Sequence, residues 1–306
     1  MLNQQRNFIK IITGICKEEG IAIEPLASEW IFRLTKDGET TYIVGYQFGL
    51  NHATASAICN DKSVTSEILT KAHIPNVGHH FFMDIQNRAY IGDVGIWQEL
   101  LELLKEFGKL VCKPNEGTGG ENVYLVTNPY ELEVAVNTIF QKSRTMAVSP
   151  FYDIEDEYRC VILDGEIRLI FKKEREYVVG NGIDSVGKLI ASQKDNVANI
   201  EDKDISSVPQ EGVRYYLSWK HNLGLGASSK TVDISEVDTE VARLAKASAS
   251  EVNVRFASVD IVRTASGYRV LEVNSGVMLE NFSKQSDTNY RIAKEIYREA
   301  ILKTYR

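Results

Sequence analysis

The stretch Arg255-Phe-Ala-Ser-Val-Asp-Ile-Val-Arg263, followed by Tyr268-Arg-Val-Leu-Glu-Val-Asn274, decides how the rest of the chain is interpreted. A Ser-Gly turn joins these two apolar runs, which predicts an antiparallel hairpin. Glu272 and Asn274 share one face of their strand, because strand side chains repeat with a period of two. If Asp260 points the same way, two carboxylates and an amide oxygen converge, and such hard oxygen ligands suit Mg²⁺. The same residues could instead be solvated polar positions of an amphipathic hairpin.

Composition limits the class of protein. A chain of 306 residues, with 43% apolar and 25% charged residues, is long enough for two or three packed layers or small domains. Its net charge of -7 argues against a nucleic-acid partner. Because we find neither a signal-peptide pattern nor a run of about 18 apolar residues, we expect a cytoplasmic protein with no membrane partner. The cysteines follow no metal or redox spacing, which is typical of reduced thiols: Cys16, Cys59, Cys112 and Cys160.

Hydrophobic periodicity predicts a mixed order of helices and strands. The expected helices cover residues 5–18, 51–60, 61–72, 97–107, a segment opened by Asn128-Pro129, 184–192, 236–252 and a segment from about residue 290. The expected strands cover residues 21–24, 30–34, 41–44, 80–83, 109–113, 122–126, 145–150, 157–163 and 166–173, in addition to the first hairpin. Residues 180–233 are less regular, and the polar segment Lys194–Pro209 is interpreted as a mobile lid.

A glycine-rich loop, Lys113-Pro-Asn-Glu-Gly-Thr-Gly-Gly-Glu-Asn122, lies between two predicted strands. It is neither a Walker loop, which leads into a helix and ends in Gly-Lys-Ser/Thr, nor a Rossmann fingerprint. Its glycines nevertheless let backbone N–H groups approach phosphate oxygens, and Lys113 adds a positive charge. A plain glycine-rich hairpin loop is the alternative interpretation.

Five motifs stand in an order that resembles the ATP-grasp ligases. They are the Lys113 loop, Glu157-Tyr-Arg159, the segment Val179–Ile190, Ser258-Val-Asp260 and Leu271-Glu-Val-Asn274. The whole chain resembles the ATP-grasp half of bifunctional glutamate–cysteine ligase/glutathione synthetase. The Gly-x-Gly segment with Lys188-Leu-Ile190 is also similar to cyanophycin synthetase. The resemblance implies an ATP-grasp fold, with two α+β subdomains (residues 61–152 and 153–306) that grip ATP and a small N-terminal α/β domain (residues 1–60).

The same resemblance implies which residues bind ATP. Pro150 would offer its carbonyl and Tyr152 its N–H to adenine, whereas Ser149 stands where the family often has Glu or Gln. Glu157 aligns with a carboxylate that binds ribose, and the alternative for it is a solvent-facing strand residue. The implied ATP-binding residues are Lys62, Lys113, Gly117, Thr118, Gly119, Gly120, Ser149, Pro150, Phe151, Tyr152 and Glu157.

Further roles follow from the resemblance. The catalytic set is Lys173, Arg159, Asn222, Gly224 and Gly226; the metal set is Asp260, Glu272 and Asn274; the substrate set is Arg175, Arg214 and His221. Lys173 aligns with a residue that meets the γ-phosphate, and the Asn222 loop would present donors to the reacting acyl group, as an oxyanion hole does. Arg159 could neutralise a substrate or pair with a neighbour. His221 could act as a base, or be a hydrogen-bonded structural residue.

The predicted function is an ATP-dependent carboxylate–amine ligase that forms an amide through an acyl phosphate. Its substrates would be amino acids or a γ-glutamyl peptide and an amine, and its cofactors ATP and two Mg²⁺ ions, for which Mn²⁺ can substitute. Relatives of this family are often dimers, and the sequence leaves open whether this chain forms a homodimer. Two alternatives stay open: a non-catalytic ATP sensor or scaffold with this fold, and an ATP-grasp enzyme that modifies a protein or a ribosomal peptide.

Overall fold

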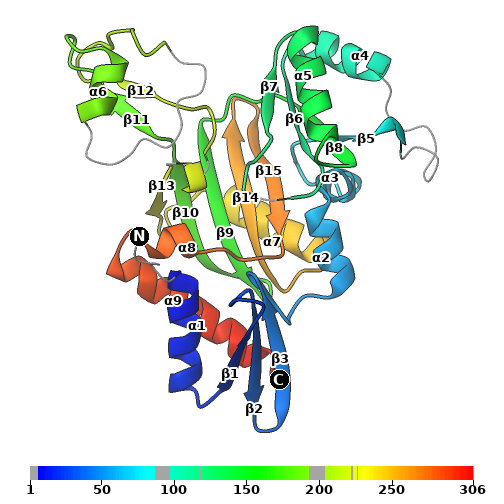
Figure 1. Ribbon diagram of the computed structural model, residues 1–306, viewed down its shortest axis with the longest axis vertical. Helices are drawn as coiled ribbons and strands as arrows, with labels where there is room; N and C mark the ends of the chain where they lie inside the picture. Colours follow the sequence, from blue (N-terminus) through cyan, green and yellow to red (C-terminus); the bar gives the residue numbers. More distant parts are fainter. Residues whose placement is uncertain are drawn as a thin grey trace.

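The computed structural model describes residues 6–86, 97–117, 119–192, 204–221, 223–225 and 227–305. Their central element is an antiparallel sheet in the order β13-β10-β9-β14-β15 (Figure 1). Its strands are β9 (Asp156–Leu163), β10 (Glu166–Glu174), β13 (Ser228–Thr231), β14 (Phe256–Thr264) and β15 (Gly267–Asn274). The two predicted hairpins are confirmed, β9–β10 and β14–β15. The first turns at Asp164 and Gly165, whose positive φ angles of 51° and 78° suit a tight hairpin turn.

One face of this sheet carries charged side chains at one end of its strands and apolar side chains at the other. Glu157 and Arg159 point to it at one end of β9, and Val161 and Leu163 point to it at the other. The apolar end is buried in a core that the sheet shares with the N-terminal and C-terminal segments of the chain. The opposite face is apolar and is covered by α7 (Thr239–Glu251), which lies behind the sheet in Figure 1. The charged half of the first face is therefore the part of the sheet that packing leaves for a site.

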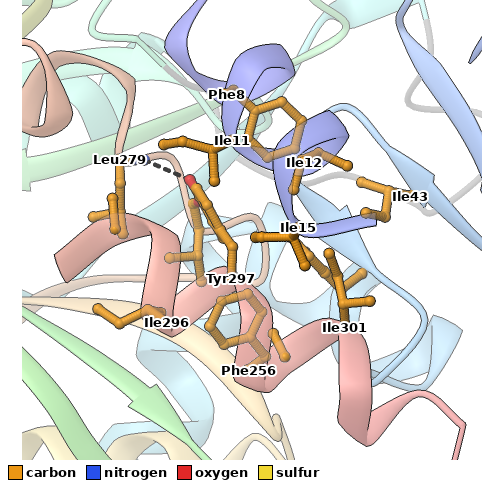
Figure 2. Packing of buried hydrophobic residues seen from close by; sticks show 14 of the residues in the cluster. Phe8, Ile11, Ile12, Ile15, Ile43, Phe256, Leu279, Ile296, Tyr297 and Ile301 are labelled. Carbon is orange, nitrogen blue, oxygen red and sulfur yellow. Dashed lines mark hydrogen bonds between the residues drawn. The ribbon is translucent and has the colours of Figure 1, made fainter. Parts of the chain in front are cut away.

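The two ends of the chain build one core. Helix α1 (Asn7–Glu18) and the sheet β1–β4 pack with α8 (Glu280–Ser283) and α9 (Asp287–Lys303), as Figure 2 shows. The small sheet consists of β1 (Ala22–Leu26), β2 (Ile31–Lys36), β3 (Glu39–Val44) and β4 (Gln47–Phe48). The buried Tyr297 hydroxyl donates to the Val277 carbonyl at 2.8 Å and accepts from the Leu279 N–H at 2.9 Å. Because both hydrogen-bonding functions of the hydroxyl are satisfied, the whole Tyr297 side chain can be buried.

A second sheet, in the order β5-β8-β6-β7, has its own core against two helices. These elements are β5 (His80–Met83), α4 (Trp97–Phe107), β6 (Leu110–Pro114), β7 (Tyr124–Val126), α5 (Pro129–Phe140) and β8 (Thr145–Pro150). The predicted cap of α5 is confirmed, since the Asn128 side chain accepts from the Glu131 N–H at 3.0 Å. The glycine-rich loop joins β6 to β7, as predicted.

Two short helices connect the small N-terminal sheet to this second sheet. They are α2 (Ala53–Asn60) and α3 (Lys62–Lys71), and Asp61 caps α3 by accepting from the Val64 N–H at 2.8 Å, as predicted. Their apolar residues Ala55, Cys59 and Leu69 pack with the central sheet and α7. The predicted division at residues 60 and 152 stays a prediction, although buried clusters join segments on both sides of each boundary.

A small lobe, which we call the arm (residues 175–192 and 204–217), stands beyond the end of β10 (Figure 1). It holds β11 (Tyr177–Val179), α6 (Val186–Ser192) and β12 (Arg214–Tyr216), and the ribbon β11–β12 was not predicted. Gly180 allows the close approach of its two halves, because a Cβ there would lie 2.2 Å from the Gln210 carbonyl oxygen. Most of the predicted lid, residues 194–203 of Lys194–Pro209, lies outside the described residues.

Candidate active site

The charged half of the central sheet face carries a row of side chains from four neighbouring strands. Across the strands, Lys173 lies opposite Glu157, Arg159 opposite Asp260, and Asp260 opposite Glu272. Residues paired in this way point to the same side of a sheet. Asp260 therefore points the same way as Glu272 and Asn274, as the convergence of these three side chains requires.

Asp260 is the centre of a buried ion network. Its side chain is 2% exposed. Arg159 binds it through two hydrogen bonds, Nε to Oδ1 at 2.7 Å and Nη2 to Oδ2 at 2.6 Å, and Lys173 Nζ lies 2.9 Å from Oδ2. Lys173 also donates to Glu157. Arg159 was expected either to neutralise a substrate or to pair with a neighbouring side chain. The structure shows the second, the pairing with Asp260.

The network shifts the pKa values of the two buried carboxylates, Asp260 and Glu157, in opposite directions. Burial tends to raise the pKa of Asp260, but the charges and hydrogen bonds of Arg159 and Lys173 outweigh it and hold that pKa well below its usual range. For Glu157, burial prevails over the attraction of Lys173 and raises the pKa. Asp260 is therefore firmly ionised, whereas Glu157 is the carboxylate that protonates more readily.

Lys62 connects the glycine-rich loop to the sheet. Its Nζ donates to the Gly117 carbonyl at 2.7 Å and lies 3.6 Å from Glu272 Oε1. The fully buried Asn115 fixes this arrangement, because its Oδ1 accepts from the N–H and the hydroxyl of Ser63 at 3.0 and 2.8 Å. Asn115 and Ser63 were not predicted. The only sequence signal was the place of Asn115 in the loop, two residues after Lys113.

Lys113 is a buried cation beside this group. Burial, together with the nearby charge of Lys62, lowers the pKa of Lys113 to about 8, although the carboxylates of Glu272 and Glu157 act in the opposite direction. A lysine held in this way is half charged near that pH and carries its full charge only well below it. The glycines of the adjoining loop, Gly117, Gly119 and Gly120, have φ angles of 112°, 85° and 74°. These left-handed conformations favour glycine, so the loop needs this composition.

The donor set fits a hard divalent cation that is bound together with phosphates. Glu272 is partly exposed, and Asn274 Nδ2 lies 3.5 Å from Glu272 Oε2, which leaves the amide oxygen of Asn274 available. Asp260 adds an ionised carboxylate on the adjacent strand, both oxygens of which already accept hydrogen bonds from Arg159 and Lys173. In the part of the chain described, no group of three or more His, Cys, Asp or Glu side chains forms a complete metal cage. Two carboxylates and an amide are instead the kind of incomplete set that Mg²⁺ uses with nucleotide phosphates.

The segment predicted to bind adenine follows β8. Ser149 is buried and Pro150 ends the strand opposite Leu110. The Phe151 N–H donates to the Lys109 carbonyl at 3.0 Å, and its ring meets Trp219 edge-on with centroids 5.8 Å apart. This contact brings the loop before His221 against the segment predicted to bind adenine, a proximity that the sequence did not reveal.

His221 lies at the edge of the network, with Nδ1 3.7 Å from Glu157 Oε2. Burial, with the charges of Arg175 and Lys173, lowers the pKa of His221 to about 3. The imidazole is therefore neutral at pH 7 and a weak proton acceptor, which argues against a general base. Its Nδ1 is buried without a hydrogen-bond partner among the described residues, so a structural role stays a prediction. Gly224 lies in the short helix η2 (Leu223–Leu225). The predicted residues Asn222, Gly226 and Thr118 lie outside the described part of the chain.

Comparisons with known proteins fit this geometry. Residues 210–299 match the RimK-like ATP-grasp domain. A bifunctional glutathione synthetase from Pasteurella multocida superposes on 97% of this chain and 44% of that chain, with a TM-score of 0.58 and 17% identity. The chain has the ATP-grasp fold. A second ATP-grasp superposition is with the D-alanine–D-alanine ligase from Bacillus anthracis complexed with ATP, which covers 82% of this chain and 69% of that chain with a TM-score of 0.52 and 16% identity.

A sequence comparison agrees. Cyanophycin synthetase of Nostoc sp. is 23% identical over 275 residues, which cover 78% of this chain and 29% of that protein. The present chain thus spans less than a third of the length of that curated relative. The predicted resemblance to ATP-grasp ligases and the predicted fold class are confirmed. No helix among the described residues is long and apolar enough to cross a membrane.

Proposed function

We propose that this chain is an ATP-dependent carboxylate–amine ligase. The observation that carries the proposal is the convergence, at one sheet face, of two lysines with carboxylate and amide oxygens. Lys62 and Lys113 come from the glycine-loop side, and the oxygens of Asp260, Glu272 and Asn274 come from the closing hairpin.

The charges of the site favour an anionic ligand. Four cations, Lys62, Lys113, Arg159 and Lys173, surround three carboxylates, Glu157, Asp260 and Glu272. Four minus three leaves a net charge of +1, and protonation of Glu157 would increase it. A buried excess of positive charge is costly without a counter-ion, so a polyphosphate is a suitable partner.

The residues support transfer of the γ-phosphoryl group to a carboxylate. The carboxylate oxygen forms a bond to γ-phosphorus as the bond to the β-phosphate oxygen breaks, giving an acyl phosphate and ADP. The amine then attacks the acyl carbon, phosphate leaves, and the amine loses one proton. Lys62, Lys113 and Lys173 would neutralise the phosphate oxygens, which is the main requirement of this reaction. Mg²⁺ would supply further charge neutralisation, held by Asp260, Glu272 and Asn274.

Within this proposal, the substrates are amino acids or small peptides and the cofactors are ATP and Mg²⁺. Two metal ions, substitution by Mn²⁺, a homodimer and a cytoplasmic location belong to it as well. The Phe151–Trp219 contact supports the assignment of adenine to residues 149–152, since two aromatic rings meet beside that segment. The available Asn274 oxygen supports the metal assignment.

The experiment is a screen of pooled amino acids and dipeptides with Mg-ATP. We expect ADP release that requires both a carboxylate and an amine, and a product lighter than the two substrates together by one water. Tight ATP binding without turnover for any pair would contradict the proposal and favour an ATP sensor. Turnover only with a polypeptide acceptor would instead favour an enzyme that modifies proteins.

A further inference from the structure

The ribbon β11–β12 of the arm carries two arginines stacked on two tyrosines. Tyr177 and Tyr216 face each other across the strands, with ring centroids 6.0 Å apart. The Arg175 guanidinium carbon lies 4.2 Å from the Tyr216 centroid, and that of Arg214 lies 4.4 Å from the Tyr177 centroid. Each arginine crosses to the tyrosine of the other strand. We call these four side chains the Arg–Tyr ladder.

Stacking positions the guanidinium groups and leaves their edges free. A guanidinium that lies over an aromatic ring uses its face, so its in-plane N–H donors stay available. In the part of the chain described, neither ladder arginine forms a side-chain hydrogen bond or ion pair. Other arginines do, for example Arg168 with Glu299 and Arg255 with Asp164. The chain has 42 acidic residues against 35 lysines and arginines, so carboxylates that could pair with these two arginines are plentiful. Because the two arginines nevertheless have no carboxylate partner among the described residues, they are suited to binding an anionic ligand.

The ladder begins at the edge of the candidate active site. Arg175 follows Lys173 by two residues, and its charge is one of the causes that lower the pKa of His221. In Figure 1 the arm and the lobe that carries α4 and α5 stand on opposite sides of the upper end of the central sheet. The residues proposed for the nucleotide phosphates, Lys62 and Lys113, belong to the second of these sides. The ladder therefore lies at the Lys173 end of the site, on the opposite side from the lobe that carries Lys113.

We propose that the Arg–Tyr ladder binds a second carboxylate of an acidic substrate, distinct from the carboxylate that accepts the phosphoryl group. A planar guanidinium edge matches a carboxylate with two parallel hydrogen bonds. The substrate class is thus a dicarboxylic amino acid or a small peptide that contains one. This inference rests on the proposed ligase function for its kinetic test, but not for its binding test.

The kinetic test uses substrate pairs that differ only in charge, glutamate against glutamine and aspartate against asparagine. Wild type should prefer the acid in kcat/KM by about tenfold or more, the value of one charged hydrogen-bonded contact. R214A should lose most of this preference, R214K should keep part of it, and the KM for ATP should stay within about twofold. The control R243A removes an exposed arginine of α7 that pairs with Glu240 and should behave as wild type. An unchanged preference in R214A, or a rise in the KM for ATP instead, would overturn the inference.

The binding test does not require turnover. N-acetylglutamate and N-acetylglutamine are titrated into wild type, R214A and R243A, with Mg-AMPPNP present. Binding of the acid only, lost in R214A and kept in R243A, supports the ladder even if no carboxylate–amine pair is ligated. Equal binding of acid and amide by wild type, or no binding of either, contradicts it. Failure of the ligase screen and failure of the ladder are thus separate results.

Discussion

At the scale of single residues, neighbouring ionisable groups have different properties because their contacts differ. Asp260 is locked by Arg159 and Lys173, so its removal would leave the buried Arg159 without its carboxylate partner and Lys173 with Glu157 alone, which threatens the fold. Glu272 is partly exposed; it pairs with Lys62 at 3.6 Å and also interacts with the charge of Lys113. Glu272 is therefore the better position at which to test the metal assignment without unfolding the protein.

We predict that Glu272→Gln reduces ligase turnover by about 10²-fold or more, because an electrostatic contact to the transition state is lost. The melting temperature should stay close to that of wild type. The matched control is Glu166→Gln, which changes an exposed glutamate of β10 that pairs with Lys246. Amine-dependent ADP release and thermal unfolding measure the two effects. Normal turnover in the Glu272 variant would remove this residue from the metal set.

Lys113 gives the site a dependence on pH. Its charge is lost as the pH rises through about 8, so kcat/KM for ATP in the free enzyme should fall above that pH. In Lys113→Arg the descending limb should move to higher pH, because a guanidinium stays charged. Rate profiles between pH 6 and 10 provide the measurement. The same descending limb in both proteins would show that another group titrates.

At the scale of elements, the paired strands were predictable and the arm was not. Alternation of apolar and polar residues, with Asp164-Gly165 and Ser266-Gly267 as turns, was enough for β9–β10 and β14–β15. Strands β11 and β12 contain three residues each and are separated by more than 30 residues, so no local pattern shows their pairing. The Arg–Tyr ladder depends on that pairing. Arg175 and Arg214 could therefore be suspected from the sequence, but their common site could not.

The arm should depend on Gly180. A Cβ at this position would lie 2.2 Å from the Gln210 oxygen and 2.6 Å from the Pro209 oxygen, so Gly180→Ala must separate the two segments. We expect faster proteolysis within residues 180–217 and a loss of preference for acidic substrates, with little change in global unfolding. Gly14→Ala, where nothing lies within 4 Å of the added carbon, is the control. Equal cleavage of both variants would contradict the role of this close approach.

At the scale of the whole molecule, residues near both ends of the chain hold each other. Glu280 of α8 accepts from the backbone N–H groups of Asn7 and Phe8, at 3.0 and 2.9 Å, at the start of α1. A carboxylate is favourable at a helix N-terminus. The sequence predicted α1 and a C-terminal helix, but a contact between residues 272 positions apart follows only from the fold. The metal-ligand set was easier to predict, because its members lie in one hairpin.

Stability should depend on Glu280 in a defined range of pH. Burial opposes its ionisation, but the hydrogen bonds from Lys284, Phe8 and Asn7 prevail and lower its pKa. The stabilisation is therefore complete above the unfolded pKa and is lost as the pH falls through the folded one. At pH 7, Glu280→Gln should lower the free energy of unfolding by about 1–2 kcal/mol. Urea unfolding should show this difference, which should shrink below about pH 4. The exposed Glu106→Gln is the control, and a pH-independent difference would contradict the account.

The central claim is that this sheet face transfers the γ-phosphoryl group of ATP to a carboxylate. The most direct measurement uses a substrate carboxylate labelled with ¹⁸O and mass analysis of the inorganic phosphate released during amide formation. The account predicts one ¹⁸O atom in each phosphate, since the acyl–oxygen bond breaks when the amine attacks. Amide formation that leaves the phosphate unlabelled, or that places the label in AMP, would contradict it.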